Sequence, residues 1–324
     1  MARPDLSYLK SVFLFLIGVP LGLLTGLTAI SGSVFGVPAV RKLLGLRPAR
    51  AVGVGLTLAF YAAVAGILSY AQHSDILFWL ALLLFVFQTL GALIAERLLR
   101  TQPRLERLTT VWGSLVIAGG VVMLAHGFGF LHKPHLPFAI TSHRIEFYGL
   151  AALLAAAVGL VSRVFGLGGV LIVPAAIYGL GLTPHVAQGT ALVVLAVASL
   201  PGVLAYARRG DWESQSATWL SAGAALGAMT GALVAVTDLT DAALLVLFGT
   251  VLAVLGMQML WRKGTAFDSA EPTAKPKLPV VPEPPLVSPA AVSESTSQAT
   301  VESAEAPPNP INEDEKETPE IKSN

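Results

Sequence analysis

Long apolar stretches separated by short polar segments run through about the first 260 residues of the chain. Eight stretches can be delimited, at 11 to about 37, 51 to 71, 76 to 95, 108 to 125, 147 to 180, 187 to 207, 214 to 236 and 242 to 261. Most of them match the roughly 20 residues that an α-helix needs to cross a bilayer. The pattern therefore predicts an all-α polytopic membrane protein with eight hydrophobic segments.

Two of these stretches, 11 to about 37 and 147 to 180, are too long for one crossing, and glycines or a proline interrupt each of them. We expect both to be broken helices. Irregular backbone at membrane depth is tolerated only where protein buries it or where it lines a wet cavity. Two breaks at matching places are the best pointer in a sequence to a transporter's substrate site.

The sequence of the second half of the chain resembles that of the first half at a constant offset of 136 positions. Between 38 and 71, 14 of 34 positions carry the same residue as the position 136 further on. The matches include prolines and a tyrosine, which a coincidence among Ala, Leu and Gly does not supply. Paired positions are Pro38 and Pro174, Gly45 and Gly181, Pro48 and Pro184, Gly53 and Gly189, Gly66 and Gly202, and Tyr70 and Tyr206. We expect a first membrane repeat at 1–125, an inter-repeat loop at 126–146 and a second membrane repeat at 147–263.

Charge in the loops predicts the topology, because cytoplasmic loops hold an excess of Lys and Arg. Basic segments lie at 41–50, 96–107, 207–213 and 262–263, whereas 72–75, 181–186 and 237–241 carry little or no positive charge. If the first stretch and the fifth stretch each enter and leave the membrane on the same face, all these basic segments fall on one side of the membrane. Each half then opens with a re-entrant hairpin followed by three crossings, which inverts the second half relative to the first. Both termini are expected to be cytoplasmic, and the loop 126–146 is expected outside despite its Lys133 and Arg144.

Composition distinguishes the apolar residues 1–263 from a C-terminal tail. The chain is 54% hydrophobic and only 13% charged, with a mean hydropathy of +0.69, which excludes an ordinary soluble enzyme. Residues 1–263 carry a net charge of +8, while the segment 264–324 carries −7 and holds 11 of the 21 prolines. Such a segment cannot bury enough apolar surface to fold, so 264–324 is expected to be a disordered, Pro-rich acidic tail.

Several chemistries are not expected. The chain has no cysteine, which excludes disulfides, thiolate nucleophiles and Cys-ligated metals. The N-terminal apolar run is longer than the roughly 7 to 15 residues of a signal peptide, so we expect an uncleaved membrane segment. The histidines between 126 and 143 lack acidic neighbours and helical spacing, so neither a metal nor another cofactor is expected. The spans contain no Asp and no Gly-x-Ser-x-Gly elbow, so we expect no enzyme activity.

The second break reads GLGGVLIVPAAIYGLGLTPHVAQGT and resembles the TauE/SafE family of membrane permeases. The resemblance rests on a glycine cluster followed by proline and on a Gly-x-x-Pro-x-x-Ala-x-Gly-Thr stretch. The matching residues are Gly166, Gly168, Gly169 and Pro174, then Gly181, Pro184, Ala187, Gly189 and Thr190. In the first half Gly32, Ser33 and Pro38 remain, and Gly53 is followed by Val54. The resemblance covers 11 to about 261 and implies a two-halved permease for small sulfur-containing anions such as sulfite and sulfonates.

Glycines let a helix stop, expose its NH groups and restart, and the positive end of a helix suits an anion. We therefore expect substrate-binding residues around the breaks: Arg163, Gly166, Gly168, Gly169, Gln188, Gly189, Thr190 and Ser33. Pro38, Gly53, Pro174, Gly181 and Pro184 are expected to shape the breaks. The competing interpretations are that the glycines merely pack helices, that Gln188 and Thr190 cap a helix, and that Ser33 bonds its own backbone.

Arg163 is the only charged side chain deep inside an apolar stretch, and such a charge is costly without a partner. No acidic residue occurs within the proposed spans, so we expect a bound anion to be its partner at mid-membrane. A backbone carbonyl or an interface reached by snorkelling is the alternative.

The leading hypothesis is a secondary transporter for a small anion, a sulfur oxyanion or an organosulfonate, in the cytoplasmic membrane. Its partners are then that anion and membrane lipids, with no nucleic acid. The alternative is a non-transporting membrane scaffold whose acidic tail recruits a soluble partner, and an ion channel is a third class that the sequence does not exclude.

Overall fold

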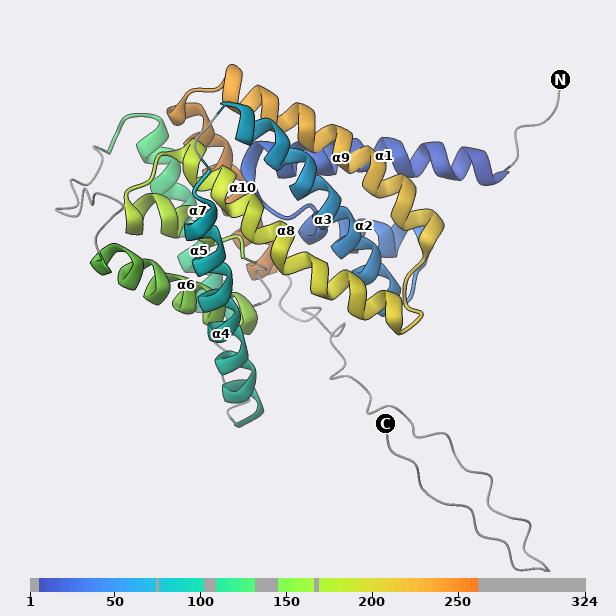
Figure 1. The fold of residues 1–324 in the computed structure, drawn as a ribbon, viewed down its shortest axis with the longest axis horizontal. Helices are drawn as coiled ribbons and strands as arrows, with labels where there is room; N and C mark the ends of the chain where they lie inside the picture. The colour runs from blue at the N-terminus through green and yellow to red at the C-terminus, as the bar shows by residue number, and fades with distance from the viewer. Residues whose placement is uncertain (1–5, 74–75, 102–108, 132–144, 166–168, 262–324) are drawn as a thin grey trace, which may run out of the picture. The chain divides into compact units, whose positions relative to one another are not determined.

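Every element in the described part of the computed structural model is a helix (Figure 1). The structure describes residues 6–73, 76–101, 109–131, 145–165 and 169–261, all of which belong to one compact unit. The expected tail, 264–324, lies outside the described residues.

The helices form two sets in the same order. The first set is α1 (Leu6–Thr28), α2 (Ser33–Leu44), α3 (Pro48–His73), α4 (Phe78–Thr101) and α5 (Thr109–Gly127). The second is α6 (Ile145–Phe165), α7 (Ile172–Pro174) with the π-helical turn η2 (Ala175–Gly179), α8 (Pro184–Arg208), α9 (Ser214–Thr237) and α10 (Asp241–Trp261). Helices α4 and α9 begin and end at repeat partners, and α3 and α8 begin at repeat partners. Each half is thus a long helix, a break, a short helical segment and three long helices.

Seven of the described helices are long and apolar enough to cross a membrane. These spans are Lys10–Thr28, Pro48–His73, Phe78–Leu98, Ile145–Arg163, Pro184–Arg208, Ser214–Thr237 and Asp241–Gln258, and the apolar part of α5, Gly113–Gly127, is shorter. Large apolar side chains such as Trp79 and Leu153 are exposed on these helices, as lipid-facing residues are. The predicted all-α, polytopic membrane architecture is confirmed for the described residues. The first stretch contains a complete span of its own, Lys10–Thr28, before its break.

Both long stretches are interrupted. Ala29 adopts a left-handed backbone (φ 55°) between α1 and α2, and the break between α6 and α7 includes Gly169 at φ 91°. The short helical segments that follow both run into a left-handed glycine, Gly45 (φ 63°) in the first half and Gly181 (φ 70°) in the second. A Cβ is disfavoured in this conformation, so this pair of repeated glycines stops the short segment in each half.

The principal helix contacts join one half of the chain to the other: α1 packs on α9, α6 on α4, α3 on α8 and α5 on α10. Figure 1 shows α1 and α9 side by side, as these contacts require. A Cβ on Gly22 of α1 would overlap the backbone of Ala224 on α9, and a Cβ on Gly159 of α6 would overlap the backbone of Gln88 on α4. Ala224 is the repeat partner of Gln88, so equivalent helix pairs make a close contact at equivalent places. Both interfaces need glycine, because only a small residue allows two helix backbones to touch.

Contacts between α3 and α8 are reciprocal. A Cβ on Gly189 of α8 would lie 3.2 Å from the ring of Tyr70 on α3, and one on Gly53 of α3 would lie 3.3 Å from Cβ of Tyr206 on α8. Gly53 and Gly189 are repeat partners, and so are Tyr70 and Tyr206. Residue numbers rise along α3 as they fall along α8, so these equivalent helices run antiparallel.

Helices α5 and α10 repeat this arrangement. A Cβ on Gly120 would lie 2.8 Å from the carbonyl oxygen of Gly249, and one on Gly256 would lie 3.0 Å from that of Gly113. Gly249 is the repeat partner of Gly113, and Gly256 is the repeat partner of Gly120. Exchanged contacts of this kind are those that a two-fold axis produces between equivalent elements.

We predict that Gly159→Ala destabilises the protein and that Gly149→Ala, on the same helix, does not. A Cβ at 159 would overlap the α4 backbone, whereas nothing lies within 4 Å of a Cβ at 149. Overpacking a tight contact costs about 1–3 kcal/mol, and Ala in place of an open helical Gly gains up to about 1 kcal/mol. Thermal unfolding in detergent compares the two variants, and equal Tm shifts would contradict the packing role of Gly159.

Candidate functional site

Helix α8 begins at Pro184, three residues after Gly181, the glycine that ends the short helical segment of the second half. Pro184 occupies the first turn of α8, where backbone NH groups have no acceptor within the helix, so the missing NH of proline costs no hydrogen bond. The N-cap is Thr183, whose side chain makes no capping bond. Gln188 lies further into the helix, and its Oε1 accepts a 2.7 Å hydrogen bond from the Tyr70 hydroxyl of α3. The alternative that Gln188 caps the helix is therefore wrong.

Gly189 and Thr190 follow Gln188 into the core. Gly189 lies against the Tyr70 ring, which leaves no room for a side chain without movement of that ring. Thr190 is fully buried, and its hydroxyl has no hydrogen-bond partner in the described part of the chain. A buried polar group without a partner costs about 1–3 kcal/mol, and native proteins contain few of them.

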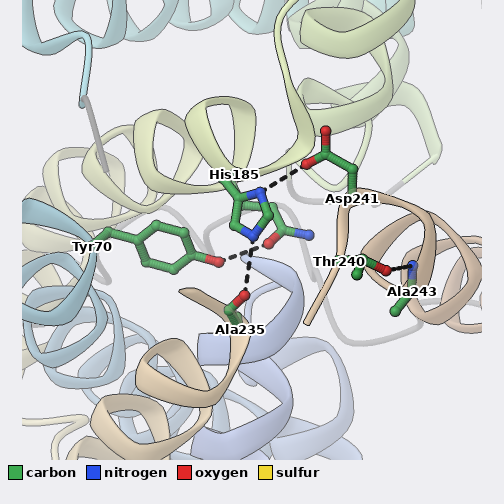
Figure 2. A network of polar contacts seen from close by, with 7 residues as sticks. Tyr70, His185, Ala235, Thr240, Asp241 and Ala243 are labelled. Atoms are coloured by element: carbon green, nitrogen blue, oxygen red, sulfur yellow. Dashed lines mark hydrogen bonds and ion pairs between the residues drawn. The ribbon is translucent and has the colours of Figure 1, made fainter. Parts of the chain in front are cut away.

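His185 ties the start of α8 to two other helices. Its Nδ1 lies 2.8 Å from Asp241 Oδ1 at the start of α10, and its Nε2 lies 3.1 Å from the carbonyl oxygen of Ala235 on α9. Figure 2 shows the imidazole between these two oxygens, with the Tyr70 hydroxyl pointing toward the same region. The first turns of α8 are thus held by side chains or backbone from α3, α9 and α10.

The second break lies against α4. A Cβ on Gly169 would lie 3.0 Å from Gln88 Nε2, and Gln88 Oε1 is buried with no hydrogen-bond partner among the described residues. The Ser162 hydroxyl on α6 is also buried and has none in the same part of the chain. Ser162 follows Gly159 by three residues, which places it on the face of α6 that meets α4. Two side chains, each with one buried polar atom that has no partner in the described part of the chain, therefore border this break.

A small apolar pocket lies one helical turn from these polar groups. It is lined from α4, α6, α7 and η2 by residues that include Leu84, Val158, Ile172 and Ala176. Leu84 precedes Gln88 by four residues and Val158 precedes Ser162 by four, so each apolar residue shares a helix face with the polar one. The break is thus apolar on one side and polar on the other.

Arg163 has an acidic partner in the structure. It lies in the last turn of α6 with its side chain 54% exposed, and its Nη2 is 3.4 Å from Glu96 Oε2 on α4. We expected a bound anion as its partner because no acidic residue lies within the proposed spans, but Glu96, one residue beyond the stretch 76 to 95, reaches Arg163. Glu96 lies 67 positions away in the sequence, and the close packing of α4 on α6 brings the two side chains together.

The remaining predicted residues are distributed over both breaks. Ser33 begins α2, where its Oγ lies 2.6 Å from Ser31 Oγ and its NH donates to that same oxygen at 3.3 Å. Gly166 and Gly168 lie outside the described residues. Of the residues expected to shape the breaks, Pro38 lies within α2, Pro174 ends α7, Gly181 follows η2, Pro184 begins α8 and Gly53 packs on Tyr206.

One contiguous apolar core holds both breaks and the start of α8. Ala29 and Ile30 from the first break, Val170 and Ile172 from the second, and Ala187 of α8 all belong to it. Val170, next to Gly169, and Ala187, next to Gln188, are therefore parts of one core. Arg163 instead contacts Glu96, and Ser33 contacts Ser31.

Residues of this region that were not among the predicted site residues include Tyr70, Gln88, Glu96 and Asp241. Gln88 could have been found, because it is the only amide side chain in the apolar stretch 76 to 95. Tyr70 was visible as a repeated tyrosine, but nothing along the chain indicates that it bonds Gln188.

These features define a polytopic helical membrane protein in which buried polar side chains lie beside glycines where helices of the two halves pack together. The family model described as sulfite exporter TauE/SafE matches residues 2–123 and 151–293. The chain belongs to the TauE/SafE family, and the resemblance noted in its sequence is confirmed.

Two relatives from Xylella fastidiosa are each named as a probable membrane transporter protein. The one from strain Temecula1 / ATCC 700964 is 33% identical over 119 residues, which cover 36% of this chain but only 44% of the relative. The one from strain 9a5c is 27% identical over 250 residues, covering 76% of this chain and 92% of the relative. No solved structure matches the chain. Family, relatives and spans together establish an integral membrane protein of a transporter family.

We predict that Tyr70→Phe lowers the free energy of unfolding by about 1–3 kcal/mol, because it leaves Gln188 Oε1 buried without its donor. Tyr206→Phe is the matched control, since the Tyr206 hydroxyl makes no hydrogen bond in the described part of the structure. Adding Gln188→Leu to Tyr70→Phe should recover part of the loss, because the unpaired oxygen is removed. Chemical unfolding measures all three variants, and equal losses for the two tyrosines would refute the assigned role.

Proposed function

We propose that the chain is a secondary transporter that moves a small anion, a sulfur oxyanion or an organosulfonate, across the cytoplasmic membrane. One observation carries the proposal: Thr190, Ser162 and Gln88 each bury a polar atom without a protein partner among the described residues, at the start of α8 and at the second break. Buried polar groups are nearly always paired. A bound solute supplies the missing partners.

The chemistry of these groups suits an oxyanion. Thr190 and Ser162 each offer a hydroxyl donor. The amide of Gln88 offers its NH₂ once it is turned over, since the two ends of an amide have nearly the same shape. In this proposal Gly166, Gly168, Gly169 and Gly189 let backbone NH groups approach the anion, Gln188 positions the turn that carries Thr190, and Ser33 is the contribution of the first half.

Arg163 supplies positive charge at the edge of this site. Its guanidinium is shared with Glu96, so the cation is partly neutralised in the absence of substrate. An anion that competes with Glu96 for Arg163 would then gain a charge-assisted contact.

The transport proposal includes an inverted repeat whose halves each open with a re-entrant hairpin, with both termini cytoplasmic. The antiparallel pairing of α3 with α8 and of α5 with α10 supports inversion, because an axis in the membrane plane turns equivalent helices over. The basic segments at 41–50 and 207–213 support the orientation.

Uptake of labelled sulfite, sulfate and an organosulfonate into vesicles containing the purified protein tests this function. Saturable flux of one of these anions supports a transporter. Absence of both flux and binding for the whole panel overturns the proposal in favour of a scaffold, and currents far above carrier turnover overturn it in favour of a channel.

We predict that Thr190→Val separates binding from stability. Valine keeps the shape of threonine and removes an unpaired buried hydroxyl, so the Tm should stay level or rise. Loss of one hydrogen bond to the anion, about 0.5–1.5 kcal/mol, should weaken affinity about 2-fold to 12-fold. Unchanged anion affinity in a folded Thr190→Val protein would remove Thr190 from the site.

Substitutions of Arg163 and of Glu96 should change anion affinity in opposite directions. Arg163→Gln should weaken anion binding by about 10-fold or more, because a charge-assisted hydrogen bond is lost. Glu96→Gln should strengthen binding, because the guanidinium no longer has a competing carboxylate. Anion titrations by thermal stabilisation compare the two, and a loss of similar size in both variants would show that the pair is only structural.

A further inference from the structure

The contacts of His185 add a second ligand to the function proposed above, on which this inference rests. We propose that His185, held between Asp241 and the carbonyl of Ala235, is a proton-binding site linked to anion binding at the start of α8. The protein would then bind its anion together with a proton.

The imidazole of His185 faces two oxygen atoms. Nδ1 lies 2.8 Å from a carboxylate oxygen of Asp241, and Nε2 lies 3.1 Å from the carbonyl oxygen of Ala235 (Figure 2). Both oxygens are acceptors at neutral pH. A neutral imidazole carries one NH and can satisfy only one of them, whereas the imidazolium carries two and satisfies both. The arrangement is therefore complete only when His185 holds a second proton.

The charges around His185 agree with this requirement. His185 lies in the first turn of α8, where the helix dipole disfavours a cation, so the second proton needs a counter-charge. Asp241 supplies it from the first turn of α10, where the dipole of that helix favours a carboxylate. The imidazole is partly exposed, at 22% of its side chain, so protons can reach it from the solvent.

Other titratable groups near this end of the helices have their own partners. Asp238, between α9 and α10, accepts from the Thr237 hydroxyl. Tyr70 of α3 donates to Gln188, and Tyr178 of η2 pairs with His126 of α5. Among the described residues, Asp241 is the carboxylate that forms an ion pair with His185.

Protonation reaches the candidate anion site through one stretch of helix. His185 precedes Thr190 by five residues, about 7.5 Å along the axis of α8. Loss of the proton breaks one of the two bonds that hold this turn and removes a positive charge close to the anion. Both effects weaken anion binding at alkaline pH. Linkage is reciprocal, so anion binding must also raise the proton occupancy of His185.

The test is anion affinity as a function of pH, with sulfate and an alkanesulfonate as probes because neither changes charge between about pH 5 and pH 8. His185→Gln removes the imidazole, and Asp241→Asn leaves the imidazole but removes its counter-charge. His73→Gln is the matched control, because Nδ1 of His73 contacts the Ser69 carbonyl of its own helix. Thermal stabilisation of the full chain by each probe gives the affinities.

The wild type and His73→Gln should bind the probe about 5-fold or more tightly at about pH 5 than at about pH 8. His185→Gln should show no such change, and Asp241→Asn a smaller one. In weak buffer at about pH 7, addition of the anion should draw protons from solution with the wild type but not with His185→Gln.

The outcomes separate the two proposals. Anion binding whose pH dependence is the same in His185→Gln and in the wild type overturns the proton site and leaves the transport proposal standing. Anion binding by the wild type that does not vary with pH also overturns the proton site and leaves the transport proposal standing. Absence of binding for every probe at every pH overturns the proposed function and the linkage with it. If His185→Gln does not fold, the Asp241→Asn variant decides, and a full pH dependence there counts against the proton site.

Discussion

Contact between helix backbones at glycines holds the two halves of this protein together. Within a membrane, burial of apolar side chains gives helices little reason to associate, so close packing has to supply the attraction. The glycines of α1 meet α9, Gly159 of α6 meets α4, and the glycines of α5 meet α10, and each of these helix pairs joins the first half to the second. Neither half can form these interfaces alone, so the whole body depends on a few positions that tolerate no Cβ.

The same close packing accounts for the position of the candidate site. Where α6 lies against α4, the helices enclose Gln88 and Ser162 at the second break. Where α8 lies against α3, Tyr70 covers Gly189 and holds Gln188, and Thr190 is buried one residue further on. Polar groups enclosed in this way cannot turn outward to solvent without opening an interface. In the proposed function a solute that enters between the halves supplies their missing hydrogen-bond partners, which agrees with the transporter family to which the chain belongs.

The sequence predicted the elements of this fold better than the contacts between them. Hydropathy predicted the helices, and the repeat predicted that Gly45 and Gly181 stand at equivalent places, where both prove to be left-handed. The partners of the polar side chains escaped prediction, because Tyr70 and Gln188 are 118 positions apart and Arg163 and Glu96 are 67 apart. A pattern along one chain reports which face of a helix is apolar. It carries no register between helices, and here that register is set by backbone contacts at glycines.

In the proposed inverted repeat the two halves face opposite ways, so that their two breaks approach one site from opposite faces of the membrane. The chain has no cysteine, so single cysteines can be introduced at the repeat partners Arg47 and Thr183, both of which are exposed. Labelling with a membrane-impermeant maleimide in sealed right-side-out vesicles measures which side each faces. An inverted repeat with cytoplasmic termini predicts that Thr183→Cys reacts from outside and that Arg47→Cys reacts only after permeabilisation. Reaction of both cysteines from the same side would contradict it.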